Sequence, residues 1–143
     1  MSSGHIHVSG VAGVGMSALA EALLDQGWRV TGSDRSHDQG VALEVLQKLQ
    51  RQGVELVPQD GAALTAQTKA LAVSTAIEAD NPEVAAAQRL GVEIVHCAEM
   101  LARLAVGKRV VAVTGTAGKT TITGMLGYLL EQAGFDPTVV NGG

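Results

Sequence analysis

The chain has 143 residues and a formal net charge of −4 at pH 7. Hydrophobic residues make up 46% of the sequence and aromatic residues only 2%, as in close-packed helices on a parallel sheet. The longest basic run is Lys108-Arg109, which excludes the clustered cations and stacking rings of a nucleic-acid surface. With no apolar run of about 18 residues, no secretory leader and one cysteine, the chain is expected to be cytoplasmic, to avoid membranes and to lack disulfides.

An amphipathic helix, a glycine and a β-rich run follow one another four times along the chain. Each glycine stands where a helix would end in the left-handed conformation. Helices that alternate with short apolar strands predict an α/β fold with a Rossmann-like, doubly wound parallel sheet. Strands are expected near 5–9, 28–32, 54–57, 70–74, 92–95 and 109–114, and helices near 15–26, 40–52, 83–90, 98–105 and 119–133. Gly107-Lys108 is a short hinge, which predicts one domain over 1–106 and the start of another over 107–143.

The stretch HIHVSGVAGVGMS runs from a predicted strand through a loop with three glycines into a helix. Backbone N–H groups and the dipole at a helix N-terminus favour a diphosphate there. Ser33 and Asp34 end the second strand, near the position of the ribose-binding acid in a dinucleotide fold. Ala12 replaces the middle glycine of GxGxxG, which weakens the case for NAD. The motif predicts a nucleotide diphosphate of open identity, and the alternative is that the glycines only allow tight packing of strand against helix.

The second loop, in RVVAVTGTAGKTT, is the stronger phosphate motif. Its backbone N–H groups would cradle phosphates, Lys119 would reach the β/γ-phosphates, and the Thr120 hydroxyl would bind Mg²⁺. Packing alone does not explain a lysine that opposes the dipole at a helix start. The spacing departs from a strict P-loop because Val113 takes the first glycine position. ATP and Mg²⁺ are the expected ligands, at Gly115, Thr116, Ala117, Gly118, Lys119, Thr120 and Thr121.

Two phosphate loops in tandem, the first in a small Rossmann-like domain, resemble the Mur ligases of peptidoglycan synthesis. The matching pieces are HIHVSGVAGVGMSALAEALLDQGWRVTGSD, VSTAI, DNPE, AEMLARL, VAVTGTAGKTT and AGFDPTVVNGG. They cover nearly the whole chain in order. GMSALAE and AEML are most similar to the branch of the family that adds L-alanine to UDP-N-acetylmuramate.

The resemblance implies a UDP-binding domain over 1–106 and, over 107–143, the first strand, P-loop and helix of a central ATPase domain. It implies diphosphate contacts at Gly13, Gly15, Met16 and Ser17, and a nucleotide cleft lined by Ser33, Asp34, Ser74 and Thr75. In the implied reaction, ATP converts the muramoyl carboxylate to an acyl phosphate that the amine of L-alanine attacks. Lys119 and a magnesium ion on Thr120 would neutralise the phosphoryl charge.

Several features depart from the family pattern, among them STAI at 74–77 where the family has SSAI, a change that keeps a hydroxyl. Ala12 and Ala18 replace glycines in the first loop, and Ala117 replaces the usual histidine in the second. Family members continue for several hundred residues, so these 143 residues are expected to bind the UDP-sugar but to be inactive alone.

A lone parallel strand leaves unpaired edges, so 109–143 is expected to dock on the first domain, self-associate or be partly disordered. Two alternatives remain: a non-catalytic module that binds a UDP-sugar or NAD, and the ligase that attaches a recycled tripeptide to UDP-N-acetylmuramate.

Overall fold

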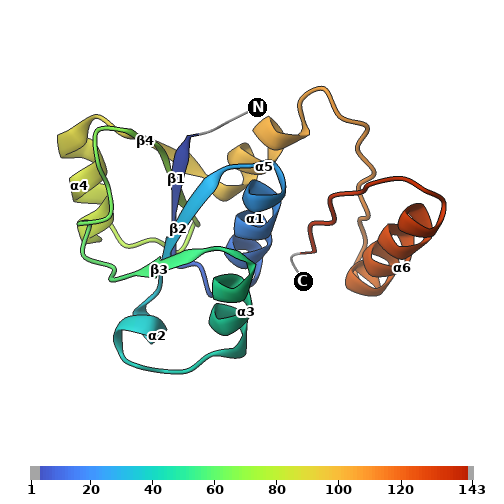
Figure 1. The fold of residues 1–143 in the computed structure, drawn as a ribbon, viewed down its shortest axis with the longest axis horizontal. Helices are drawn as coiled ribbons and strands as arrows, with labels where there is room; N and C mark the ends of the chain where they lie inside the picture. The colour runs from blue at the N-terminus through green and yellow to red at the C-terminus, as the bar shows by residue number, and fades with distance from the viewer. Residues whose placement is uncertain (1–3, 142–143) are drawn as a thin grey trace.

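A five-stranded parallel sheet in the order β3-β2-β1-β4-β5 forms the centre of the chain in the computed structural model, which describes residues 4–141 (Figure 1). This confirms the α/β fold with a parallel sheet. The strands are β1 (His5–Ser9), β2 (Arg29–Ser33), β3 (Glu55–Val57), β4 (Thr68–Val73) and β5 (Glu93–His96). The helices are α1 (Val14–Asp25), α2 (Arg35–Asp38), α3 (Glu44–Gln52), α4 (Pro82–Leu90), α5 (Cys97–Ala105) and α6 (Lys119–Gln132).

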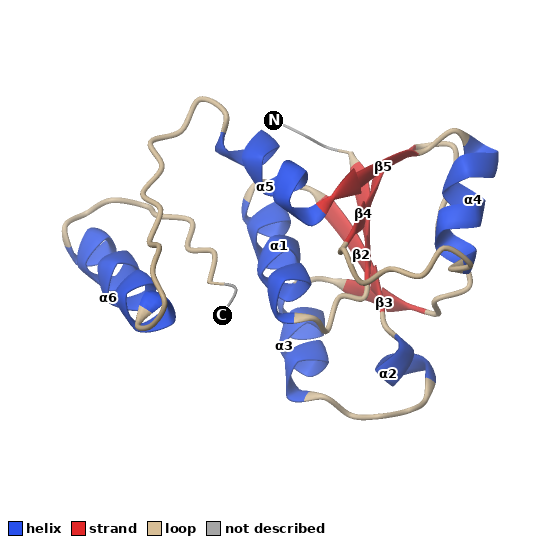
Figure 2. Ribbon diagram, turned by 180° about the vertical axis from the view of Figure 1, so that it is seen from behind, coloured by secondary structure: helices blue, strands red, loops and turns tan. Residues whose placement is uncertain are grey.

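Helices cover both faces of the sheet: α1, α3 and α5 lie on one face and α4 on the other (Figure 2). Because side chains alternate along a strand, Ile6 and Val8 join the core under α1, α3 and α5. Leu71 and Val73 of β4 point the other way and pack with α4. The sheet is therefore buried on both sides along its central strands, as parallel sheets are.

The predicted helix ends agree with the structure at α3 and α4. Gly53 and Gly91 cap the two helices in the left-handed conformation, with φ of 116° and 70°. At the start of α4, the Asn81 side chain accepts a hydrogen bond of 2.8 Å from the Glu83 N–H, and Pro82 takes the first turn. The helix expected over 40–52 begins only at Glu44, and a short helix, α2, precedes it.

The connection from β3 to β4 is a loop over 58–67 rather than a helix. It approaches α4 so closely at Gly61 that a Cβ atom there would lie 2.9 Å from the Pro82 carbonyl oxygen. Gly61 has a φ of 83°, so both the space and the backbone conformation require glycine. The loop therefore closes the sheet face beside α4 without a crossover helix.

The strand expected over 109–114 is wrong, because these residues have no regular secondary structure. A parallel strand exists only through hydrogen bonds to neighbouring strands, and no described strand lies beside this segment. Val110 and Val111 are accordingly 64% and 68% exposed. Helix α6 forms as predicted and stands away from the sheet (Figure 1), and the chain that follows it contacts α1 through a hydrogen bond from Thr138 to Asp25. None of the described helices is long and apolar enough to cross a membrane.

Candidate functional site

A cleft of about 260 Å³ lies at the carboxyl ends of β1 and β4. From β1 the sheet continues through β2 and β3 on one side and from β4 to β5 on the other, so the strand order reverses between β1 and β4. Open parallel sheets bind their ligands at such a reversal, outside the carboxyl ends of the strands. The lining residues are Ser9, Gly10, Asp34, Arg35, Gln59, Ser74, Ala76, Ile77, Glu78 and Asn81.

The first glycine loop forms a tight turn at the edge of this cleft. The Gly13 N–H donates to the Gly10 carbonyl over 3.0 Å, and Gly10 has a φ of 69°. Helix α1 then begins without a side-chain cap, and its first backbone hydrogen bond runs from the Ser17 N–H to the Gly13 carbonyl. A Cβ atom at Gly15 would meet nothing within 4 Å. Residues 13–15 are exposed, so no side chain covers the backbone at the start of α1. Of the predicted loop, however, only Gly10 lines the cleft, and Gly13, Gly15, Met16 and Ser17 do not.

Met16 and Ser17, the two residues with side chains among those predicted at the diphosphate, use these side chains for contacts within the protein. Met16 is 4% exposed and packs in the core, so only its backbone N–H can face a ligand. The Ser17 hydroxyl donates to the Val14 carbonyl over 2.9 Å within the first turn of α1. Any recognition of phosphate by this loop would thus come mainly from backbone groups and the helix dipole.

Asp34 fastens the glycine loop to the end of β2. One carboxylate oxygen accepts from the Ala12 N–H over 3.0 Å, and the other accepts from the Ser36 N–H over 2.9 Å. Both oxygens of the residue predicted as a ribose-binding acid are thus already bonded to backbone. Asp34 lines the cleft, but its observed contacts set the position of the loop.

Of the other residues predicted to line the nucleotide cleft, one lies in the lining and two do not. Ser74 lines the cleft, and its hydroxyl accepts from the Ala76 N–H over 3.3 Å. Ser33 is fully buried below the surface, and Thr75 is exposed outside the cleft lining. The structure therefore brings Asp34 and Ser74 together and leaves Ser33 and Thr75 out of the lining.

An ion pair that the sequence did not reveal spans the cleft. Arg35, the first residue of α2, binds Glu78 in the turn between β4 and α4, with Nη1 and Oε1 3.2 Å apart and a second, shorter contact between Nη2 and Oε2. The hydrogen bond and the charge of Arg35 hold the pKa of the Glu78 carboxyl below its ordinary value. The two residues are 43 positions apart, so only the strand order shows that they meet.

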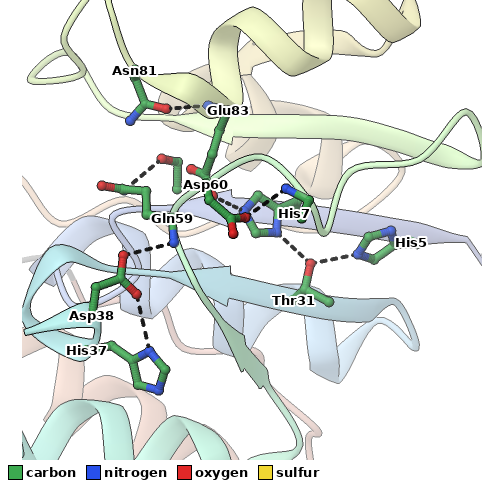
Figure 3. Close-up of polar contacts among 11 residues, drawn as sticks. His5, His7, Thr31, His37, Asp38, Gln59, Asp60, Asn81 and Glu83 are labelled. Atoms are coloured by element: carbon green, nitrogen blue, oxygen red, sulfur yellow. Dashed lines mark hydrogen bonds and ion pairs between the residues drawn. The ribbon is translucent and has the colours of Figure 1, made fainter. Parts of the chain in front are cut away.

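A polar chain that is buried at Thr31, His7 and Glu83 and half-buried at His5 runs through the sheet beside the cleft (Figure 3). The Thr31 hydroxyl lies 2.7 Å from His5 Nε2 and 2.6 Å from His7 Nδ1, and His7 Nε2 lies 2.7 Å from Glu83 Oε1. Burial opposes the charged form of Glu83, but His7, helped by Ser33 and Ser9, outweighs it and holds the pKa of the carboxyl below its usual value.

His5 and His7 both belong to β1, and both take part in the polar chain. No group of three potential metal ligands occurs among residues 4–141. Sequence reasoning missed Glu83, whose only signal is its place two residues after the helix cap Asn81.

The second glycine loop lies apart from the cleft, since no residue after Asn81 lines it. Lys119 begins α6, and its ammonium donates to the Gly115 carbonyl over 2.8 Å, which folds the side chain back over the loop. Gly115 and Gly118 have φ of 144° and 78°, which the turn into the helix requires. The Asn141 side chain donates to the Thr120 carbonyl over 3.0 Å. A cation over a glycine turn at a helix start is an arrangement that suits phosphate.

Comparison with protein families gives a match to the model described as Mur ligase family, catalytic domain, over residues 5–109. Three curated relatives carry the name UDP-N-acetylmuramate–L-alanine ligase. The protein of Rhodopseudomonas palustris is 44% identical over 98% of this chain, that of Carboxydothermus hydrogenoformans 40% over 96%, and that of Acidiphilium cryptum 43% over 100%. The chain spans 29% of the length of each of these relatives.

Solved structures with the same fold carry related names. UDP-N-acetylmuramate-alanine ligase of Thermotoga maritima matches with a TM-score of 0.74 and 30% identity, over 90% of this chain and 29% of its own. A murein peptide ligase of Psychrobacter arcticus matches with a TM-score of 0.76 and 30% identity, over 91% of this chain and 27% of its own. The ligase of Neisseria meningitides that joins UDP-N-acetylmuramate to L-alanyl-gamma-D-glutamyl-meso-diaminopimelate has a TM-score of 0.76 and 26% identity, over 93% and 41%.

Proposed function

The chain belongs to the Mur ligase family, and on that premise we propose that it is the N-terminal part of an ATP-dependent ligase that adds L-alanine to UDP-N-acetylmuramate. The relatives that carry this name match the chain almost from end to end. Residues 1–106 form the UDP-sugar-binding domain, and residues 107–143 begin the ATP-binding domain. The observation that carries the proposal is the open glycine loop beside a polar cleft at the reversal of strand order.

The UDP group takes the cleft described above. Its diphosphate lies against the backbone at Gly13, Gly15, Met16 and Ser17, where the start of α1 has no side-chain cap and the space is open. Asp34 positions the loop through its bond to the Ala12 N–H. The nucleoside extends along the side of the cleft that Ser74 lines, with Ser33 below it and Thr75 at its margin.

The second loop fits a phosphate because Lys119 places its ammonium over a turn of left-handed glycines. We assign the ATP phosphates to 115–121, with Lys119 neutralising their charge and the Thr120 hydroxyl as the magnesium ligand. ATP supplies the phosphoryl group that activates the muramoyl carboxylate toward the amine of L-alanine. The alanine at position 117 removes a side chain from this loop and leaves its backbone donors.

The 143 residues alone are inactive under this proposal. Within 107–143, large apolar side chains are exposed that a complete ATPase domain would bury: Val110, Val111, Ile122, Met125, Tyr128 and Leu129. The same surface favours self-association through 109–143, which gel filtration at several concentrations would detect.

A ligand-dependent melting experiment tests the site. UDP-N-acetylmuramate at about 100 times its Kd should stabilise the chain by about 2.7 kcal/mol, and NAD should leave its Tm unchanged. Lys119→Ala serves as the control, since it alters the second loop and should keep the whole UDP-sugar effect. Stabilisation by NAD alone would support a dinucleotide-binding module instead, and no response to either ligand would refute the assignment of the cleft.

The tripeptide-recycling ligase is the second candidate, because the murein peptide ligases have TM-scores as high as the alanine-adding enzyme. Both reactions use UDP-N-acetylmuramate, so binding at this cleft does not separate them. Phosphate release by a longer protein that contains these residues does: dependence on L-alanine supports the first function, and dependence on the tripeptide supports the second.

A further inference from the structure

The ionised side chains that line the cleft already have partners within the protein. Asp34, Arg35 and Glu78 are the ionised side chains that line it. Both carboxylate oxygens of Asp34 already accept backbone hydrogen bonds. Arg35 is the single cationic residue of the lining, and it forms an ion pair with Glu78. With Arg35 neutralised in this way, the remaining charge of the cleft is that of Asp34, which disfavours an anionic ligand.

The ion pair joins opposite walls of the cleft. Arg35 follows Asp34 at the end of β2, and Glu78 belongs to the turn that leaves β4. The two side chains are 61% and 56% exposed. Exposed ion pairs of this kind stabilise proteins little, because water and salt screen them. A ligand with stronger charge can therefore displace Glu78 without disturbing the sheet.

We propose that Arg35 selects anionic ligands in this cleft, and that Glu78 holds it until a phosphate oxygen of a nucleoside diphosphate takes the place of the carboxylate. This inference rests on the proposed binding of a UDP group at the same site. A guanidinium offers the same pair of parallel N–H donors to a carboxylate and to a phosphate, so the exchange preserves its hydrogen-bond geometry. Glu78 then turns into solvent, where its charge is well hydrated.

The exchange makes Glu78 a competitor of the ligand. Removing its charge should leave Arg35 available and tighten the binding of diphosphates. Asp80 also lies near enough to raise the pKa of Arg35, so it contributes a weaker competing charge. An uncharged nucleoside gains nothing from Arg35, and its affinity should be independent of Glu78.

Calorimetric titration with UDP, and NMR titration with uridine, test the exchange on the full chain. Glu78→Gln should tighten UDP binding by about 3-fold, and Arg35→Gln should weaken it by about 10-fold or more. In the Arg35→Gln background, Glu78→Gln should have no effect. Glu55→Gln is the matched control, because Glu55 forms an equally exposed pair with Arg29 at the opposite end of the strands and should leave the UDP affinity unchanged.

The outcomes separate this inference from the proposed function. UDP binding that Glu78→Gln leaves unchanged or weakens would refute the competition and leave the UDP site intact. An equal gain for uridine and UDP would show that Arg35 does not select charge, and would also refute it. No binding of UDP to the wild-type chain or to any variant would refute the proposed function together with this inference.

Discussion

Replacing Glu83 with alanine tests the buried polar chain most directly. The Glu83 carboxylate and the His7 ring are fully buried, and they share a hydrogen bond of 2.7 Å between Oε1 and Nε2. The alanine variant removes the carboxylate and leaves a ring nitrogen of His7 in the interior without this partner. Water cannot easily compensate, because the loop over 58–67 and α4 cover this face of the sheet.

The expected cost follows from the burial of both groups. A hydrogen bond to a charged group contributes about 1.5–3 kcal/mol, and an abandoned buried partner costs about 1–3 kcal/mol more. Together these two contributions lead us to expect that Glu83→Ala lowers the free energy of unfolding by about 3–5 kcal/mol. Glu83→Gln keeps an acceptor oxygen for His7, so it should cost only about 1–2 kcal/mol.

The pH dependence provides a second test. The folded pKa of Glu83 lies below its unfolded value, so the ionised carboxylate contributes stability that is fully present above the unfolded pKa of about 4.3. That contribution is lost as the pH falls through the folded pKa. The wild-type chain should therefore have a larger free energy of unfolding than Glu83→Gln at neutral pH, and this difference should disappear at acid pH.

Urea unfolding followed by the fluorescence of Trp28, the single tryptophan, measures these differences. Glu55→Ala is the control, since it breaks an ion pair that is more than half exposed on both sides and should cost less than about 1 kcal/mol. A Glu83→Ala variant that is no less stable than Glu55→Ala would refute the reasoning. The reasoning would also be refuted if the difference in the free energy of unfolding between wild type and Glu83→Gln were the same at pH 7 and at acid pH.

Two further substitutions test the glycine loop. Gly32→Ala would place a Cβ atom 2.9 Å from Val11 Cγ1, so it should lower the free energy of unfolding in urea by about 1–3 kcal/mol and weaken UDP binding. The control is Gly124→Ala, at an open helical position, which should be neutral or stabilising by up to about 1 kcal/mol. Equal stability of these two variants would contradict the close packing of β2 against the loop. Asp34→Ala frees the Ala12 N–H and should weaken UDP binding by about 10-fold with faster amide hydrogen exchange at Ala12, and unchanged exchange there would show that the carboxylate does not hold the loop.

The fold was largely predictable because its signals are local. Gly53 and Gly91 mark helix ends through a backbone conformation that glycine adopts cheaply, and Asn81 marks a helix start through its side chain. Such signals place strands and helices within a few residues. They fail at 109–114, where the apolar run RVVAVT favours a strand but the described chain offers no neighbour to pair with it.

The site was predictable only in part, for a related reason. A glycine loop between a strand and a helix can be recognised from the sequence, and the structure has such a turn at Gly10 and Gly13. The phosphate contact predicted there stays a prediction. Partners brought together by the sheet leave no such trace: Arg35 meets Glu78 across 43 residues, and His7 meets Glu83 across 76. Burial decides the rest, since Met16 and Ser33 occupy promising positions yet face the interior.

The helix-free connection from β3 to β4 has a consequence for how ligand preference can change. Gln59, near its start, donates from its backbone to Asp38 over 2.9 Å and from its side chain to the Ser9 hydroxyl over 3.3 Å, so one residue of this loop forms part of the cleft wall. Had a helix stood there, any insertion would have disturbed its packing. In this architecture, added or exchanged residues at 58–60 would reshape the wall of the cleft while every strand keeps its partner, so this short stretch is a favourable place for changing the shape and polarity of the cleft.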